Sequence, residues 1–246
     1  MIRPLSSINL LMNYKKMLQE LIEQCDKGVF RVNRMYLKTR GEKGYWLYRF
    51  LRPILKVRYA MFRRIHKPAP WLSPTSILFF KKYLKSDMVG AEFGSGSSTL
   101  FFAPRISKLY SIEHNKEWYD LISSKLKSCH LNNVDYRFIL QNDKNDFKNE
   151  SYDLEDNGDY EVRRDYVNYF RALNDIEDRT LDFAIVDGRA RTECCFEIIL
   201  KIKKGGILIL DNSERDRYNP VFKKMSDESI YRTTNGLTNT TFWFLK

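Results

Sequence analysis

Residues 89–99 read VGAEFGSGSST, and this stretch decides the fold. Its apolar beginning predicts a buried strand, and the glycine-rich segment after Phe93 predicts a tight loop that opens a helix. Gly94 and Gly96 let the backbone turn sharply and let a ligand approach closely. The start of the following helix presents unpaired N–H groups to an anionic group. The stretch therefore predicts a ligand site at the end of a strand, with a plain glycine turn as the alternative.

The sequence around this stretch alternates strands with helices, which is typical of a parallel sheet with crossover helices. We expect a helix at residues 73–85, a polar loop or insertion at 141–159 and a helix at 160–173. Strands are expected at residues 88–93, 108–113, 134–140, 181–187, 207–211, 229–233 and 240–245. The pattern predicts an α/β, Rossmann-like domain.

The positive charge is concentrated near the N-terminus. The formal net charge is +11, and residues 1–67 hold 16 of the 42 Lys and Arg residues but only 4 of the 31 Asp and Glu residues. Apolar spacing predicts helices at 5–26 and 46–66, the second kinked or split by Pro53. Two prolines at 68 and 70 predict a stiff linker, so we divide the chain into a basic helical extension, residues 1–67, and a main domain, residues 68–246.

Residues 31–67 of the extension combine cations with aromatic side chains and have three interpretations. A basic amphipathic helix binds anionic membrane surfaces. Cations interleaved with aromatic residues also suit RNA. The third interpretation is a helical cap that packs on the main domain or on a second subunit. One apolar face is expected on the second helix, formed by Leu47, Phe50, Leu51, Ile54, Met61, Phe62 and Ile65.

Composition excludes several classes of protein. With 43% apolar and 30% charged residues among 246, the chain has a globular balance. No stretch approaches the roughly 18 consecutive apolar residues of a spanning helix, which argues against an integral membrane or exported protein. The four cysteines, Cys25, Cys129, Cys194 and Cys195, have no CxxC spacing and predict neither a zinc site nor a disulfide framework. We expect a cytoplasmic protein, peripheral on the inner membrane surface if the extension is an anchor.

Glu113 ends the strand that follows the glycine loop. A carboxylate there can accept hydrogen bonds from both hydroxyls of a ribose. Together with the glycine loop it indicates an adenosine-containing ligand. A dinucleotide site would need a third glycine near Thr99, which is missing. Glu92 would repel a diphosphate but suits a ligand that carries an ammonium and a sulfonium group.

The sequence from about Trp71 to Lys246 resembles the class I S-adenosylmethionine (SAM)-dependent methyltransferases. The resemblance rests on five motifs in this order: PWLSP at 70–74, EFGSGSST at 92–99, SIEH at 111–114 with Trp118, VDGRAR at 186–191, and KGG at 204–206 leading into LDNS at 210–213. It implies a seven-stranded sheet of order 3-2-1-4-5-7-6 with an antiparallel last strand. It also implies SAM as cofactor.

The resemblance also implies roles for matching residues. Glu92, Gly94 and Gly96, with Ser95 between the glycines, would surround the methionine end of SAM. Glu113 would hold the ribose. Asn142 and Asp143, after Gln141 at the end of the third strand, would lie near the adenine.

Three oxygen donors follow the fourth and fifth strands, namely Asp187, Asp211 and Asn212. Such donors at one sheet edge suit Mg²⁺, as in the metal-dependent O-methyltransferases that they resemble. Arg189 and Arg191 allow another arrangement, in which the arginines turn inward and pair with Asp187 or with an anionic substrate. The third possibility is that these residues only cap the strands.

The function that we predict is transfer of the SAM methyl group to a hydroxyl of a small-molecule or glycan-like acceptor. Asp187, Asp211 or His114 would take the proton from the acceptor oxygen. The fourth strand ends in VDGR, without the Asn/Asp-Pro-Pro-aromatic run of enzymes that methylate nucleic-acid amines, which argues against a nucleic-acid acceptor. The alternative is a catalytically inactive SAM-fold module that its N-terminus recruits to membrane or RNA.

Overall fold

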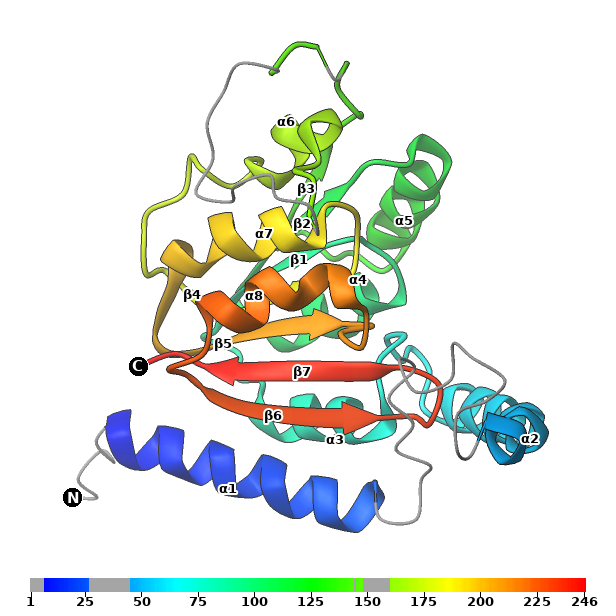
Figure 1. Ribbon diagram of the computed structural model, residues 1–246. Coiled ribbons are helices and arrows are strands. Elements are labelled where there is room, and N and C mark those ends of the chain that lie inside the picture. Colours follow the sequence, from blue (N-terminus) through cyan, green and yellow to red (C-terminus); the bar gives the residue numbers. More distant parts are fainter. Residues whose placement is uncertain (1–6, 27–44, 144, 148–159) are drawn as a thin grey trace.

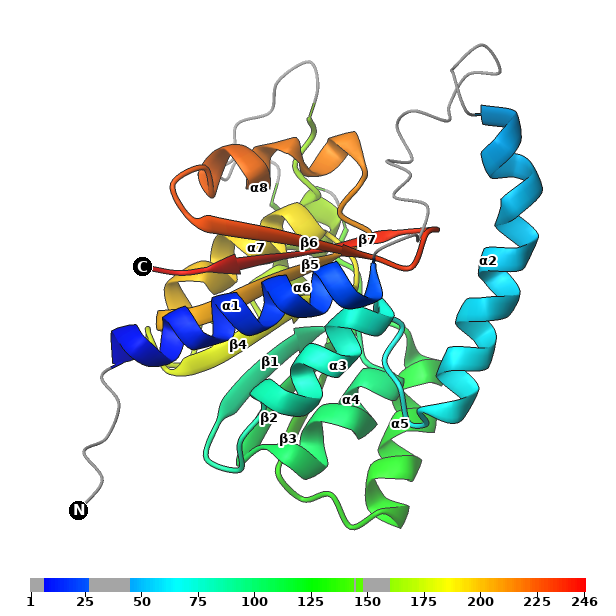
Figure 2. The same ribbon diagram turned by 90° about the horizontal axis from the view of Figure 1, so that it is seen from below.

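The computed structural model describes residues 7–26, 45–143, 145–147 and 160–246, and its centre is a sheet between two layers of helices (Figures 1 and 2). The strands are β1 (Val89–Phe93), β2 (Lys108–Glu113), β3 (Val134–Phe138), β4 (Leu181–Val186), β5 (Ile202–Asp211), β6 (Ser229–Thr234) and β7 (Asn239–Phe244). Their order is β3-β2-β1-β4-β5-β7-β6. β7 is antiparallel to both of its neighbours, and the pairs among β1 to β5 are parallel. The predicted fold class and strand order are confirmed.

Helices cover both faces of the sheet. They are α1 (Ser7–Cys25), α2 (Tyr45–Ile65), α3 (Pro74–Tyr83), α4 (Ser97–Phe102), α5 (Lys116–Ser128), α6 (Val167–Phe170), α7 (Arg191–Ile198) and α8 (Asn219–Lys224). Buried side chains of α1, α3 and α4 form one apolar core, and those of α6, α7 and α8 form a second core across the sheet. In β7, Trp243 belongs to the second core while Phe242 and Phe244 belong to the first, as expected when successive strand residues point to opposite faces.

The start of α3 follows the sequence prediction. Pro74 is its first residue, and the Ser73 hydroxyl accepts a hydrogen bond from the Ser76 N–H at 3.1 Å. This cap fixes where the chain enters the main domain.

The helix predicted at residues 160–173 is wrong in its extent. The structure has a short 3-10 helix at Arg164–Tyr166 and the single turn α6. Two backbone N–H groups of this segment bond to neighbouring elements: that of Arg163 donates to Glu193 at 2.6 Å, and that of Asn168 to the Asn142 side chain at 3.0 Å. These tertiary hydrogen bonds leave only short helical turns in the segment.

Helix α1 packs on the main domain. Leu18, Leu21 and Ile22 are buried in the first core. Asp26, just after the helix, accepts hydrogen bonds from the Thr75 hydroxyl at 2.5 Å and from the Thr234 N–H at 3.0 Å. This part of the extension is therefore a cap on the sheet domain. The division of the chain into an extension, residues 1–67, and a main domain, residues 68–246, stays a prediction.

Helix α2 stands apart from the sheet (Figure 2). It continues through Pro53, so the proline does not split it. Tyr48 and Leu55 are buried, and Phe62 packs against the first core. Within the described part of the chain, none of the helices has the length and apolarity to cross a membrane.

Candidate functional site

The glycine loop, Gly94 to Gly96, connects β1 to α4 and is held between the neighbouring strands. Gly94 has φ +94°, and a Cβ placed on it would lie 2.7 Å from the Gly188 nitrogen. Both the backbone conformation and this contact require glycine. The Gly94 N–H donates to the Ile112 carbonyl at 2.9 Å, which fixes the loop against β2.

Glu113, at the end of β2, is hydrogen-bonded through both carboxylate oxygens. Oε2 accepts from the N–H of Ser95 at 3.1 Å and from its hydroxyl at 2.8 Å. Oε1 accepts from the backbone N–H groups of His114 and Asn115 at 2.8 and 2.9 Å. Burial by itself would raise the pKa of Glu113, but the hydrogen bonds outweigh it and lower the pKa. The group is therefore an ionised acceptor beside the glycine loop.

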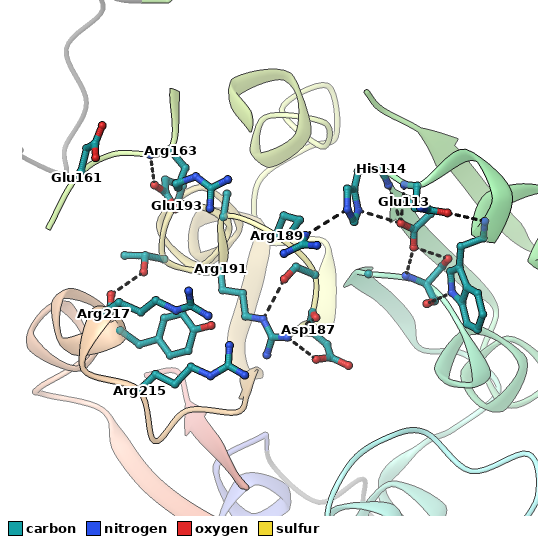
Figure 3. Close-up of a pocket in the computed structure, with 18 of the residues that line it drawn as sticks. Glu113, His114, Glu161, Arg163, Asp187, Arg189, Arg191, Glu193, Arg215 and Arg217 are labelled. Atoms are coloured by element: carbon teal, nitrogen blue, oxygen red, sulfur yellow. Dashed lines mark hydrogen bonds and ion pairs between the residues drawn. The ribbon is translucent and has the colours of Figure 1, made fainter. Parts of the chain in front are cut away.

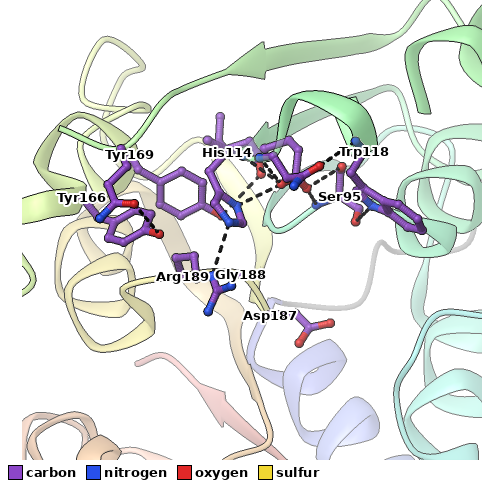
Figure 4. Close-up of polar contacts among 12 residues, drawn as sticks. Ser95, His114, Trp118, Tyr166, Tyr169, Asp187, Gly188 and Arg189 are labelled. Atoms are coloured by element: carbon purple, nitrogen blue, oxygen red, sulfur yellow. Dashed lines mark hydrogen bonds and ion pairs between the residues drawn. The ribbon is translucent and has the colours of Figure 1, made fainter. Parts of the chain in front are cut away.

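His114 lies between Glu113 and Arg189 (Figure 3), and its contact with Arg189 is also visible in Figure 4. Its Nδ1 is 2.9 Å from Glu113 Oε1, and its Nε2 accepts a hydrogen bond from Arg189 Nε at 3.3 Å. His114 is thus placed to orient Glu113 and Arg189, and its predicted role as a base stays a prediction.

Glu92 is completely buried beneath the glycine loop. Its carboxylate accepts hydrogen bonds from the Thr99 hydroxyl and, at 2.7 Å, from the Ser111 hydroxyl, so it joins β1 to α4 and β2. Burial raises its pKa to about 7. Glu92 lines neither of the two cavities described below. The structure therefore places it under the loop rather than at the surface that a ligand would contact.

The raised pKa of Glu92 predicts a pH-dependent stability. Since an unfolded glutamate titrates near 4.3 and the folded one near 7, the folded protein loses stability as the pH rises between these values. Between pH 4.5 and pH 8, the free energy of unfolding of Glu92→Gln should rise by about 3 kcal/mol relative to that of the wild type, because only the wild type must ionise this buried group. Urea unfolding of both proteins at the two pH values measures the difference. A difference that does not change with pH would contradict the prediction.

A cavity of about 850 Å³ opens beside the glycine loop, at the carboxyl ends of the parallel strands (Figure 3). One side is formed by Gly94, Ser95, Glu113 and Trp118, and the other by Asp187 and by residues from α7 and the segments near 160 and 215. The Trp118 indole N–H donates to the Ser95 carbonyl at 2.7 Å and so holds one wall. The volume is in the range of small-molecule sites, and the position is where open α/β sheets bind ligands.

Arg191 joins the ends of β4 and β5. Its guanidinium forms an ion pair with the Asp187 carboxylate at 2.8 Å and donates to the carbonyls of Asp187 and Asp211, both at 2.5 Å, and of Gly188 at 3.0 Å. Burial raises the pKa of Asp187, and burial together with the charge of Asp187 raises that of Asp211. The two acids therefore hold a proton more readily than ordinary aspartates.

The predicted metal ligands do not fit Mg²⁺. The Arg191 cation already neutralises Asp187. Asp211 is buried and accepts from the Thr240 hydroxyl at 2.7 Å, while the Asn212 amide oxygen accepts from Arg215 at 3.3 Å. Each oxygen donor has a partner that a metal would have to displace. The observed arrangement corresponds to the other prediction, in which an arginine turns inward and pairs with Asp187.

A second cavity of about 340 Å³ lies on the other side of Asp187. Asp187, Ser95 and Trp118 line both cavities, and Asp211 and Asn212 line the second. Tyr59 of α2 and Trp71 complete a wall, and the Tyr59 hydroxyl donates to the Leu72 carbonyl at 2.8 Å. Asp187 thus lies between the two cavities.

Asn142 and Asp143, which are predicted near the adenine, lie in the segment that follows β3. The Asn142 N–H donates to the Asp165 carbonyl at 2.8 Å, and Asp143 accepts from the Asn145 N–H at 2.9 Å. Neither residue lines the two cavities. Asn142 holds the segment after β3 to the segment around residue 165, whereas Asp143 bonds within its own segment.

Sequence reasoning missed Arg215 and Arg217, which line the larger cavity. They belong to the run ERDR at residues 214–217, shortly after the end of the fifth strand. Two arginines at alternate positions beyond a strand end would have indicated cations at the ligand-binding edge of the sheet. Among the described residues, neither they nor Arg189 forms an ion pair with a carboxylate. The cavity therefore offers three cations to a ligand.

The strand order is that of the Rossmann-like fold of the class I SAM-dependent methyltransferases, as the sequence resemblance predicts. No family model and no curated protein matches the chain. Among solved structures, a precorrin 8w decarboxylase from Methanobacterium thermoautotrophicum is 18% identical, with a TM-score of 0.50 over 73% of this chain and 92% of that one. A methyltransferase-like protein from Silicibacter pomeroyi is 19% identical, with a TM-score of 0.50 over 72% and 89%. An rRNA methylase from Streptococcus thermophilus is 14% identical, with a TM-score of 0.50 over 72% and 100%.

Proposed function

We propose that this protein is a SAM-dependent methyltransferase that methylates a hydroxyl of a small-molecule or glycan-like acceptor. The observation that carries the proposal is the larger cavity, where the glycine loop, Glu113 and Asp187 from three adjacent strand ends surround one space. When bound there, SAM supplies a methyl group on a sulfonium, which is a good leaving group. The protein then has to position the acceptor and receive its proton.

Glu113 and Ser95 would hold the ribose. Because both carboxylate oxygens of Glu113 already have donors, a ribose hydroxyl must replace one of them. The donor that can be replaced most easily is the Ser95 hydroxyl, because it lies 2.6 Å from a second partner, the Tyr136 hydroxyl. If a ribose hydroxyl displaces it from Glu113, the Ser95 hydroxyl keeps its hydrogen bond with Tyr136.

Asp187 would receive the acceptor proton. It lies between the two cavities, and its raised pKa makes its carboxylate a stronger base than that of an ordinary aspartate. Arg189, Arg215 and Arg217 favour an acceptor that also carries a carboxylate or a phosphate.

The direct experiment is methyl transfer from labelled SAM to a cell extract that has been separated into small-molecule, lipid-linked glycan, RNA and protein pools. We expect label in an alkali-stable ether of the small-molecule or glycan pool. Label in RNA would overturn the acceptor assignment. SAM binding without transfer to any pool would indicate the inactive binding module.

Removal of Glu113 should weaken SAM binding. We expect Glu113→Ala to lose about 1–3 kcal/mol of binding free energy in calorimetry, because ribose hydroxyls and loop donors lose their acceptor. NAD should not bind to the wild type. Glu117→Ala is the matched control, since Glu117 lines the same cavity but is exposed. Equal SAM affinity of the two variants, both with wild-type melting, would remove Glu113 from the cofactor site.

A further inference from the structure

Helix α2 has a continuous apolar stripe that faces solvent. This outer stripe consists of six residues, Trp46, Phe50, Ile54, Val57, Met61 and Ile65. The exposed fraction of these residues ranges from 57% for Trp46 to 76% for Phe50. Their spacing of three or four residues places all six on one side of the helix. A contiguous exposed apolar surface of this kind marks an interaction site.

The outer stripe is separate from the face that holds α2 to the domain. Tyr48, Leu55, Tyr59 and Phe62 are buried or partly buried on the opposite side. The Arg63 guanidinium lies 4.0 Å from the centre of the Trp71 ring, which adds a cation–π contact at the attached end. The single apolar face predicted from the sequence is therefore wrong, because Phe62 lies on the inner side and Phe50, Ile54, Met61 and Ile65 on the outer side.

Cations flank the outer stripe. The sequence of α2, YWLYRFLRPILKVRYAMFRRI, contains Arg49, Arg52, Lys56, Arg58, Arg63 and Arg64 and no acidic residue. Arg49, Lys56, Arg58 and Arg64 are exposed. An apolar stripe between cations on a helix that is too polar to cross a bilayer is typical of a helix that lies in the interface of an anionic membrane.

We propose that α2 docks this protein on an anionic membrane surface, with the outer stripe at the level of the acyl chains and the flanking cations at the headgroups. Charge complementarity favours an anionic lipid surface over a second copy of the chain, since two α2 helices that carry only positive charges repel each other. It favours lipid over RNA because four of the six stripe residues are aliphatic or Met and offer no ring for base stacking. Tyr59 lines the second cavity from the inner face, so docking would bring that cavity close to the membrane.

The test is co-sedimentation of the full chain with vesicles of phosphatidylcholine alone or mixed with phosphatidylglycerol. We expect binding to the mixed vesicles only, weakened but not abolished when the salt rises above physiological strength, where screening already acts over roughly 8 Å. Phe50→Gln with Ile65→Gln should reduce binding by at least about tenfold through loss of inserted apolar area. Arg49→Glu with Lys56→Glu should reduce it by a similar or larger factor, because two attractions to the anionic headgroups become repulsions.

Leu121→Gln with Leu140→Gln is the matched control, because these two exposed apolar residues lie outside α2. This variant should bind vesicles like the wild type. The proposal would be overturned if the wild type binds neutral and anionic vesicles equally, or if the control variant loses as much vesicle binding as Phe50→Gln with Ile65→Gln. A second copy would be the partner if the wild type is a dimer in ultracentrifugation, does not bind vesicles, and is dissociated by Phe50→Gln with Ile65→Gln. Tight RNA binding without vesicle binding would also overturn the proposal. None of these readouts depends on methyl transfer.

Discussion

Replacement of Asp187 by asparagine should reduce methyl transfer by a factor of about 10² to 10⁴, the range for loss of a general base. SAM affinity should change little, because the carboxylate lies between the two cavities while the glycine loop and Glu113 remain. The raised pKa of Asp187 gives a further expectation. Wild-type turnover at saturating SAM should fall as the pH drops through that pKa, since only the ionised form accepts a proton. Single-turnover rates, with SAM affinity measured separately by calorimetry, provide the check.

Asp182→Asn is the control for this variant. Asp182 lies near the opposite end of the same strand, where it accepts from the Val89 N–H at 2.7 Å and from Lys203 at 3.0 Å. It touches neither cavity, so its variant should keep wild-type turnover. If Asp187→Asn also turns over normally, the proton goes to another group and the proposed role of Asp187 is wrong.

Replacement of Arg191 by methionine should destabilise the protein by about 1–3 kcal/mol, the range for leaving polar groups without their partner, because the Asp187 side chain of the ion pair is itself 34% exposed. The variant leaves the Asp187 carboxylate without its cation and three backbone carbonyls without a donor. Without the cation, the folded pKa of Asp187 rises further above its unfolded value. The stability of the variant relative to the wild type should therefore decrease as the pH rises. Denaturant unfolding at two pH values measures both effects.

Arg189→Met separates this structural role from the charge of the cavity. Arg189 is exposed and its side chain donates a hydrogen bond to His114, so its loss should change the free energy of unfolding by no more than about 1 kcal/mol. If the two variants are equally stable, Arg191 does not hold the strand ends together.

The strands and the glycine loop were predictable because their signals are local. The apolar run before Gly94 predicts a buried strand wherever it lies, and β1 begins within one residue of the expected start. The N-cap at Ser73 followed by Pro74 likewise acts within one helical turn. Features that needed contacts between distant residues were harder to predict. Nothing in the sequence near residue 165 shows that backbone N–H groups there donate to Asn142 and Glu193, or that the helix is reduced to short turns.

The sequence by itself determined where the strands and the glycine loop lie along the chain, since these depend on hydrophobic periodicity and on the backbone freedom of glycine. The order of the strands in the sheet followed from the family resemblance. Only the tertiary structure decided what the polar groups do. Asp187 was compatible with a metal, an arginine or a strand cap, and the choice depends on where the Arg191 guanidinium lies. The same holds for Glu92, which is completely buried, and for the two apolar faces of α2. Charge and burial act between residues that are far apart in the chain, and the physical reason is that a side chain's partners are set by packing and not by its neighbours in the sequence.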